Sequence, residues 1–178
     1  MIDWPDLRDL FKGIPWVLIG GVATRAYMVE RLTKDMDILV HERDSEEVID
    51  RLKRAGYTVV SKLAVPGYLL RSPEGVEIDV QFGEHRWLDE VLAHPNFDPA
   101  GYPVIGLPYL VLLKMWATRD QDWTDITRML STATEEQINE VRAVVARHSP
   151  EDSDDLETMI YLGKREMEMP DQPDNPEA

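Results

Sequence analysis

Two aspartates give the clearest chemical signal in this sequence. Asp35 and Asp37 lie two residues apart in residues 35–40, where acidic and apolar side chains alternate as they do in a strand. Side chains two apart on a strand point to the same face, so these carboxylates repel each other unless a cation lies between them. Oxygen ligands of this kind suit a hard divalent cation. The pair therefore predicts a magnesium site, with manganese as the alternative ion; the competing interpretation is two solvated surface carboxylates.

A pair of glycines precedes the aspartates. The apolar run Trp16–Ile19 predicts a short buried strand, Gly20-Gly21 ends it, and a helical pattern follows as far as Leu32. Glycines let the backbone approach a ligand closely, and the start of a helix directs N–H groups toward it. This junction therefore predicts a phosphate-binding turn. A second strand is expected over Met36–Val40.

Gly20-Gly21, the spacer that follows them and the pair Asp35 and Asp37 together resemble the signature of the nucleotidyltransferase superfamily, which has the DNA polymerase beta-like fold. The resemblance implies that the glycines hold the phosphates of a nucleoside triphosphate, such as ATP, and that the aspartates hold magnesium. It also implies a third carboxylate on a neighbouring strand.

Asp79 matches that third carboxylate, because apolar Ile78 and Val80 flank it in the expected strand Val76–Phe82. Glu77 lies on the same strand face and is the alternative. We expect Glu77 to be exposed and to pair with Arg71 instead. The resemblance then assigns Asp79 to the second metal ion and to deprotonation of the acceptor.

Arg31 and Thr33 fit the R-x-[ST]-x-D form that the toxin-like and the antibiotic-modifying members of the superfamily share. In that resemblance Arg31 binds a phosphate or fixes the aspartate strand, and Thr33 belongs to the same nucleotide-binding segment.

Residues 112–130 resemble the helical segment of the toxin-like AbiEii/MenA nucleotidyltransferases, through Lys114, Arg119, Asp122 and Asp125. The resemblance implies that Lys114 faces the triphosphate and takes part in catalysis. In the alternative, Lys114 extends from an apolar helix face to water. The two aspartates would then pair with Arg119 and Arg128 or cap the helix.

The implied reaction moves a nucleoside monophosphate from the triphosphate to an acceptor hydroxyl. The toxin-like branch is the first expectation, with RNA or protein as the acceptor and an antitoxin as a partner. The antibiotic-modifying branch is the alternative and takes a small molecule. A third hypothesis is a binding module that keeps the fold without catalysis.

The patterns predict an α+β fold. A mixed sheet of about five strands, with helices on one side, is followed by a helical region. Short helices are expected over Pro5–Phe11 and Arg86–His94, and capping boxes at Asp44–Glu47 and Thr134–Gln137. The expected parts are a nucleotidyltransferase core over 1–94, a Pro/Gly-rich connector over 95–108, helices over 109–169 and a disordered acidic tail over 170–178.

The composition limits which classes of partner molecule, and which cellular location, are expected. The net charge is −15, and residues 150–178 hold ten of the acidic residues against two basic ones. General attraction to nucleic acid is not expected of such a chain. The absence of cysteine favours a reducing, cytoplasmic location, and the apolar run Ile14–Ala23 is too short to span a membrane. The four histidines lack metal-ligand spacing and are expected at the surface.

Overall fold

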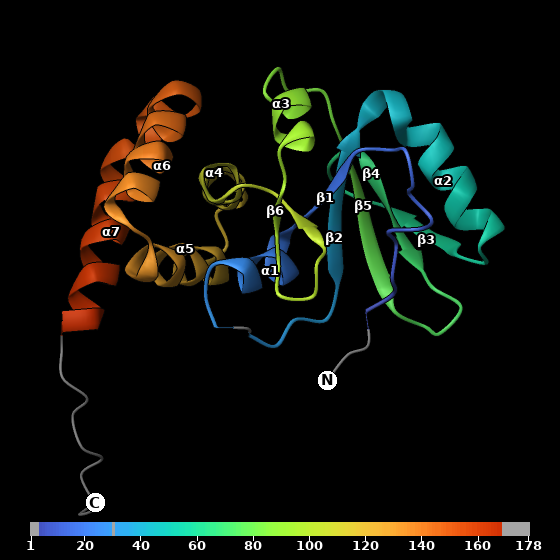
Figure 1. Ribbon diagram of the computed structural model, residues 1–178, viewed down its shortest axis with the longest axis horizontal. Helices are drawn as coiled ribbons and strands as arrows, with labels where there is room; N and C mark the ends of the chain where they lie inside the picture. The colour runs from blue at the N-terminus through green and yellow to red at the C-terminus, as the bar shows by residue number, and fades with distance from the viewer. Residues whose placement is uncertain (1–3, 30, 169–178) are drawn as a thin grey trace, which may run out of the picture. The chain divides into compact units, whose positions relative to one another are not determined.

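The computed structural model describes residues 4–29 and 31–168 and divides into two compact units, Met1–Gly106 and Leu107–Ala178. The first unit carries a β-sheet with short helices, and the second is entirely helical where it is described (Figure 1). Most of the expected connector, residues 95–106, therefore belongs to the first unit by its contacts. The expected tail over 170–178 lies outside the described residues.

The first unit contains a seven-stranded mixed sheet in the order β3-β4-β5-β2-β1-β7-β6. Two neighbouring pairs, β2 with β5 and β1 with β7, run parallel, and the other pairs are antiparallel. The central strands come from segments far apart in the sequence, and this arrangement positions the site. The strands are β1 (Trp16–Ile19), β2 (Met36–His41), β3 (Thr58–Lys62), β4 (Gly67–Arg71), β5 (Glu77–Gly83), β6 (Asn96–Phe97) and β7 (Pro103–Val104).

The expectation of about five strands is wrong by two. The additional strands, β6 and β7, contain two residues each and lie inside the Pro/Gly-rich segment expected to be irregular. A two-residue strand cannot show the alternation on which sequence-based assignment depends. Their pairing is tertiary, because Leu18 of β1 lies beside Val104 of β7.

Helices of the first unit are short, and they occur on both faces of the sheet rather than on one. Ile49 of α2 lines a groove with Phe82 of β5, on one face. Leu88 of α3 lies close to Gly83 on the opposite face of the same strand. Residues 5–11, expected to be helical, form no helix, since 5–7 have no regular secondary structure and 8–13 form turns. The helical elements are α1 (Gly20–Ala23), η1 (Thr24–Ala26), η2 (Glu42–Asp44), α2 (Ser45–Arg54) and α3 (Leu88–Ala93).

The two faces of β2 differ at the start of the strand. Met36, Ile38 and Val40 are fully buried, as their alternation predicts, while the other face carries half-buried Asp37 and buried Leu39. The helical pattern expected from Gly21 to Leu32 shortens to α1 and η1, and Glu30 lies outside the described residues. One face of β2 thus anchors the strand in the core, and the other presents the acidic side chains.

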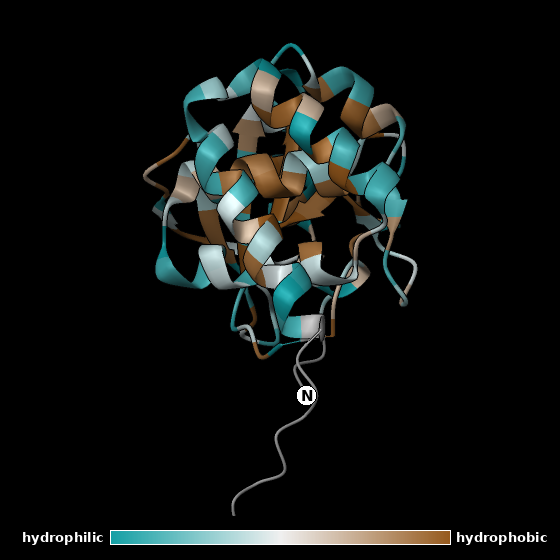
Figure 2. Cartoon of the chain, turned by 90° about the vertical axis from the view of Figure 1, so that its left-hand side faces the viewer, coloured by the Kyte–Doolittle hydropathy of each residue, from teal (hydrophilic) through white to brown (hydrophobic). Residues whose placement is uncertain are grey.

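The second unit consists of helices with apolar inward faces. Figure 2 shows hydrophilic and hydrophobic residues alternating along the outer helices, as amphipathic helices require. The helix α4 is apolar around most of its circumference and is largely buried. The capping box expected at Thr134–Gln137 is confirmed, whereas Asp44 makes no side-chain cap at the start of α2. The helices are α4 (Leu107–Ala117), α5 (Asp120–Thr132), α6 (Glu135–His148), η3 (Pro150–Asp152) and α7 (Ser153–Glu168).

Candidate active site

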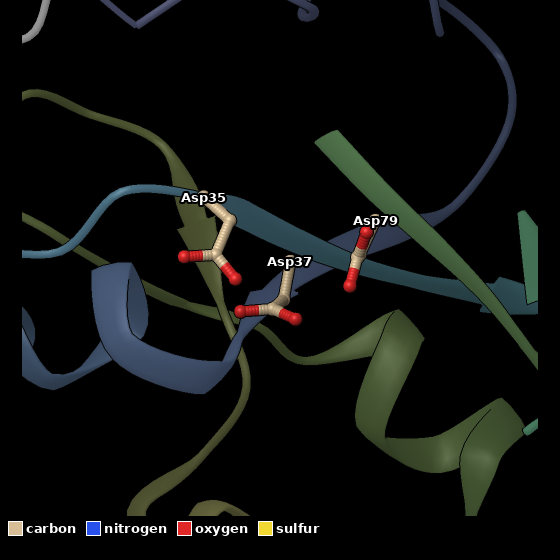
Figure 3. Close-up of side chains that lie close together, drawn as sticks. All are labelled: Asp35, Asp37 and Asp79. Carbon is tan, nitrogen blue, oxygen red and sulfur yellow. The ribbon is translucent and has the colours of Figure 1, made fainter. Parts of the chain in front are cut away.

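Three aspartates meet on one face of the sheet, at the start of two parallel strands. The register of β2 and β5 places Asp37 directly beside Asp79, and Asp35 lies one residue before β2. One carboxylate oxygen from each of the three lies within 4.8 Å of the others. Figure 3 shows the three side chains projecting to the same side of the two strands. The sequence-predicted convergence is therefore present.

The electrostatics of this cluster favour a bound cation. Burial raises the pKa of Asp79 above its ordinary value, and the negative charges of Asp35 and Glu77 raise it further. Asp35 is exposed, and Asp37 and Asp79 are half-buried, so the carboxylates are accessible to an ion from solvent. Three converging carboxylates are the donor set that a hard divalent cation prefers. The residues present therefore fit magnesium or manganese.

Glu77, the alternative third ligand, has a different partner. Its carboxylate lies 2.7 Å from the guanidinium of Arg71 on the adjacent strand β4. This pair was expected from the sequence and is confirmed. Asp79 remains the acidic residue of β5 that lies with Asp35 and Asp37.

Gly20 is required at its position by both backbone and space. Its φ of +63° is a conformation that side chains other than glycine rarely adopt. A Cβ atom there would lie 2.0 Å from Oδ2 of Asp37, which is a severe overlap. The glycine turn thus packs directly on a metal-ligand candidate.

Gly21 brings the predicted nucleotide-binding side chains to the same turn. A Cβ atom at Gly21 would lie 2.7 Å from Oγ1 of Thr33 and 3.0 Å from Nη2 of Arg31. Arg31 also donates a hydrogen bond to the carbonyl oxygen of Leu32, at 3.2 Å. The structure therefore gathers Gly20, Gly21, Arg31 and Thr33 beside the aspartates, and their nucleotide-binding roles stay predictions.

Lys114 lies in the second unit within a buried ionic cluster. Its Nζ donates hydrogen bonds to Oδ1 of Asp122 at 2.9 Å and to Oδ2 of Asp125 at 2.7 Å. Burial raises the pKa of Asp122, but hydrogen bonds from Arg119 and Lys114, with their positive charges, lower it more, so the net shift is downward. Lys114 does not extend to water, since its side chain is 3% exposed. Its role as a phosphate ligand stays a prediction.

Sequence reasoning missed a second ion pair, which supports the glycine turn. Asp98 is fully buried, and its Oδ2 lies 2.5 Å from both Nε and Nη2 of Arg25, which follows the turn by a few residues. No local pattern could reveal this pair, because Arg25 and Asp98 are distant in the sequence. An acidic residue in an otherwise apolar and Pro/Gly-rich segment is the one signal that points to it.

The fold and the acidic site define a nucleotidyltransferase. The lincosamide antibiotic adenylyltransferase LnuA, solved with lincomycin bound, aligns with a TM-score of 0.50 and 16% identity, over 71% of this chain and 94% of that one. The antibiotic-resistance factor ANT(2″)-Ia, solved in solution, aligns with a TM-score of 0.50 and 16% identity over 90% and 89%. These two structures share the fold of this protein.

The sequence itself gives the family. Residues 7–100, just over half of the chain, match the family described as aminoglycoside-2″-adenylyltransferase, and the chain belongs to that family. No curated protein sequence matches the chain. Neither the family nor the aligned structures support the particular closeness to the toxin-like AbiEii/MenA proteins. In the described part of the chain, no helix has the length and apolarity needed to cross a membrane.

Proposed function

We propose that this protein is an antibiotic-modifying adenylyltransferase, which transfers AMP from ATP to a hydroxyl group of a small cationic acceptor with magnesium as the cofactor. The observation that carries this proposal is the convergence of Asp35, Asp37 and Asp79 within 4.8 Å, beside a glycine turn that admits no side chain. Asp35, Asp37 and Asp79 would hold the metal. When bound, magnesium would neutralise charge on the triphosphate and assist its cleavage.

The side chains around the cluster would divide the remaining work. The backbone at Gly20 and Gly21 would bind phosphate oxygens, since glycine permits the close approach. Arg31 would neutralise a further phosphate charge, and Thr33 would hold the segment against Gly21. Asp79 would accept the proton of the acceptor hydroxyl, as a carboxylate placed beside the reacting groups can.

The reaction follows from this placement. The acceptor oxygen forms a bond to the α-phosphorus while the bond from that phosphorus to the bridging oxygen breaks. Pyrophosphate leaves with that electron pair, and the acceptor proton passes to a carboxylate oxygen of Asp79. Positioned charge and orientation supply the acceleration.

Two observations support a small cationic acceptor over RNA or protein. The family is described by an aminoglycoside-modifying activity, and LnuA acts on a lincosamide antibiotic. The chain also carries a net charge of −15, which attracts a polycationic molecule and repels nucleic acid. The expectation of a toxin-like acceptor depends on the pattern around Lys114, whose described partners are Asp122 and Asp125.

The experiment measures pyrophosphate release and acceptor mass. The purified protein is incubated with Mg²⁺, each of the four nucleoside triphosphates, and either tobramycin, which ANT(2″)-Ia binds as its adenylyl derivative, or lincomycin. We expect ATP and tobramycin to give an acceptor heavier by one AMP group, and the Asp37→Asn variant to give about a hundredfold less or lower. Magnesium-dependent nucleotide binding without transfer to either drug would contradict the proposed acceptor.

The remaining hypotheses have separate readouts. Growth arrest on expression in a susceptible host, lost in Asp37→Asn, would restore the toxin-like prediction and the search for an antitoxin partner. A melting temperature that no combination of Mg²⁺ and nucleotide changes would indicate a binding module that only keeps the fold.

A further inference from the structure

The segment that contains the glycine turn is too short to be stable as an isolated helix. The elements α1 (Gly20–Ala23) and η1 (Thr24–Ala26) together span seven residues, whereas isolated helices need roughly 12 or more residues to be even marginally stable. Inside the segment, the hydroxyl of Thr24 donates to the carbonyl oxygen of Gly21, at 2.8 Å. The position of the turn must therefore be fixed by contacts with other parts of the unit.

The position of this segment matters because its two glycines pack closely against side chains of the site. Gly20 packs against the Asp37 carboxylate, and Gly21 packs against Thr33 and Arg31. A small displacement of the segment would move the backbone that faces the phosphates. It would also move the backbone against which Thr33 and Arg31 pack, whereas Asp37 and Asp79 stay held by the pairing of β2 with β5.

The side chain of Arg25, in the segment, and that of Tyr27, the residue directly after it, connect it to residues 96–105. Arg25 pairs with the fully buried Asp98, whose other oxygen, Oδ1, accepts hydrogen bonds from the backbone N–H groups of Ala100 at 2.9 Å and Tyr102 at 2.8 Å. The hydroxyl of Tyr27 donates to the carbonyl oxygen of Ile105, at 2.6 Å. The Asp98 carboxylate thus orders its own loop and receives the arginine at the same time.

Residues 96–105 are in turn attached to the strand that leads into the turn. Val104 of β7 lies beside Leu18 of β1, and the N–H of Ile105 donates to the carbonyl oxygen of Leu18, at 3.1 Å. The chain therefore closes a ring, which runs from β1 through Gly20 to Arg25, across to Asp98, and back to β1. Such a ring holds the glycine turn from both of its ends.

We propose that the pair of Arg25 and Asp98 is a positioning device for nucleotide binding, which holds the glycine turn in the geometry that receives the triphosphate. This inference rests on the proposed function, because it assigns the turn to the nucleotide. Arg25 acts through the backbone of Gly20 and Gly21 and does not contact the reacting atoms. Removing the pair weakens nucleotide binding and leaves the three aspartates in place.

The test compares Arg25→Met with Arg8→Met. Arg8 is the matched control, because its guanidinium also lies over the ring of Tyr102 and contacts the same loop at the carbonyl oxygen of Ala100, while its ion pair is with Asp6. For each variant, affinity for Mg²⁺-ATP is measured by calorimetry, KM and kcat by pyrophosphate release, and Tm by thermal unfolding. Arg25→Lys is the conservative variant, and Asp98→Asn removes the partner charge and keeps an oxygen for the loop N–H groups.

The expected result for Arg25→Met is a rise of about tenfold or more in both Kd and KM for ATP, with a much smaller change in kcat, since misplaced binding groups cost that much. Arg25→Lys should restore most of the affinity, Asp98→Asn should behave like Arg25→Met, and Arg8→Met should bind ATP like the wild type. If Arg25→Met does not fold, Asp98→Asn decides by the same comparison.

Equal ATP affinities in the wild type, Arg25→Met and Asp98→Asn would overturn the positioning role, provided that binding by the wild type still depends on Asp37. A parallel loss of Tm and kcat, with KM unchanged, would also overturn it and indicate a purely structural pair. If the wild type shows no magnesium-dependent binding of ATP, the proposed function itself fails, and this inference fails with it.

Discussion

The two units each contain a cluster of aspartates, and the clusters have opposite electrostatic designs. In the first unit, the pKa of Asp79 is raised by burial and by the acidic neighbours Asp35 and Glu77. In the second, Asp122 and Asp125 share the ammonium of Lys114, and Arg119 donates a further hydrogen bond to Asp122. Two positive side chains thus balance two negative ones in the second cluster.

The difference shows how to separate a structural carboxylate from a ligand. Where the chain supplies its own cations, as around Lys114, the carboxylates serve the fold, and the buried pair is satisfied. Where the charged neighbours of a carboxylate are themselves acidic, as around Asp79, the favourable partner has to come from solution. The same residue type therefore predicts opposite responses to mutation in the two units.

The largest effect is expected at Asp37. Asp37→Asn removes a charge from the metal-ligand candidates, so transfer activity should fall about a hundred- to thousandfold, as it does when a preorganised electrostatic group is lost. Activity is measured as pyrophosphate release.

Glu77→Gln is the matched control for that variant, since it neutralises an acidic residue that is paired with Arg71. Turnover close to that of the wild type is expected. If Glu77→Gln were as inactive as Asp37→Asn, the assignment of Asp79 as the third ligand would be wrong.

The second largest effect is expected at Lys114, on stability instead of activity. Lys114→Met leaves Asp122 and Asp125 buried without their shared cation, which should lower the free energy of unfolding by about 3–5 kcal/mol. Urea unfolding measures it, and adding Asp122→Asn and Asp125→Asn to the variant should recover part of the loss. A Lys114→Met protein with normal stability and weak ATP binding would instead support the predicted phosphate contact.

A smaller effect is expected from pH, through Asp79. Its pKa is raised in the folded state, so its contribution to stability is fully present below the ordinary carboxyl value and is lost as pH rises through the folded pKa. At neutral pH without metal, Asp79→Asn should therefore have a higher Tm than the wild type, and the gain should vanish on acidification.

Magnesium should reverse that order, because it stabilises the wild-type carboxylates and finds fewer ligands in Asp79→Asn. Thermal unfolding across pH, with Mg²⁺ and with a chelator, measures both effects. A wild-type Tm that is insensitive to Mg²⁺ at every pH would remove the contrast between the two clusters.

The smallest effect is expected at an exposed ion pair of the second unit. Arg142 lies 2.6 Å from Glu157, but the two side chains are 38% and 52% exposed. Water already solvates both charges, so Arg142→Gln should lower the free energy of unfolding by only about 0.2–1 kcal/mol. A loss in urea unfolding comparable to that of Lys114→Met would show that burial does not separate the ion pairs of this unit.

The parts of the fold that the sequence could predict are those with a clear periodicity of apolar residues. Strand β1 was expected with its observed ends, and the buried face of Met36, Ile38 and Val40 follows from simple alternation. The short strands β6 and β7 were not predicted, because β7 pairs with β1, which is distant in the sequence, and β6 pairs only with β7. The helix expected over Pro5–Phe11 failed because three apolar residues in seven can also serve a turn that packs on the core, as Leu7 and Phe11 do.

For the candidate site, the sequence predicted the acidic residues but not the contacts that surround or support them. The spacing of the glycines and the aspartate pair predicted a site at Asp35 and Asp37, and the resemblance to the nucleotidyltransferase superfamily implied Asp79 as the third carboxylate. The environment of Lys114 did not follow, since an apolar helix face cannot show that Asp122 and Asp125 return to it. The support from Asp98 was also invisible, because only the folded loop joins it to Arg25.

The parallel pairing of β2 with β5 has a consequence for assembly. A hairpin cannot join two parallel neighbours, so the chain must pass through α2, β3 and β4 before β5 can lie beside β2. Asp37 and Asp79 therefore lie apart until β5 has paired with β2. Tight uptake of a divalent ion would then mark completion of the central sheet, and a nascent or nicked chain that ends before β5 would have little affinity for the ion.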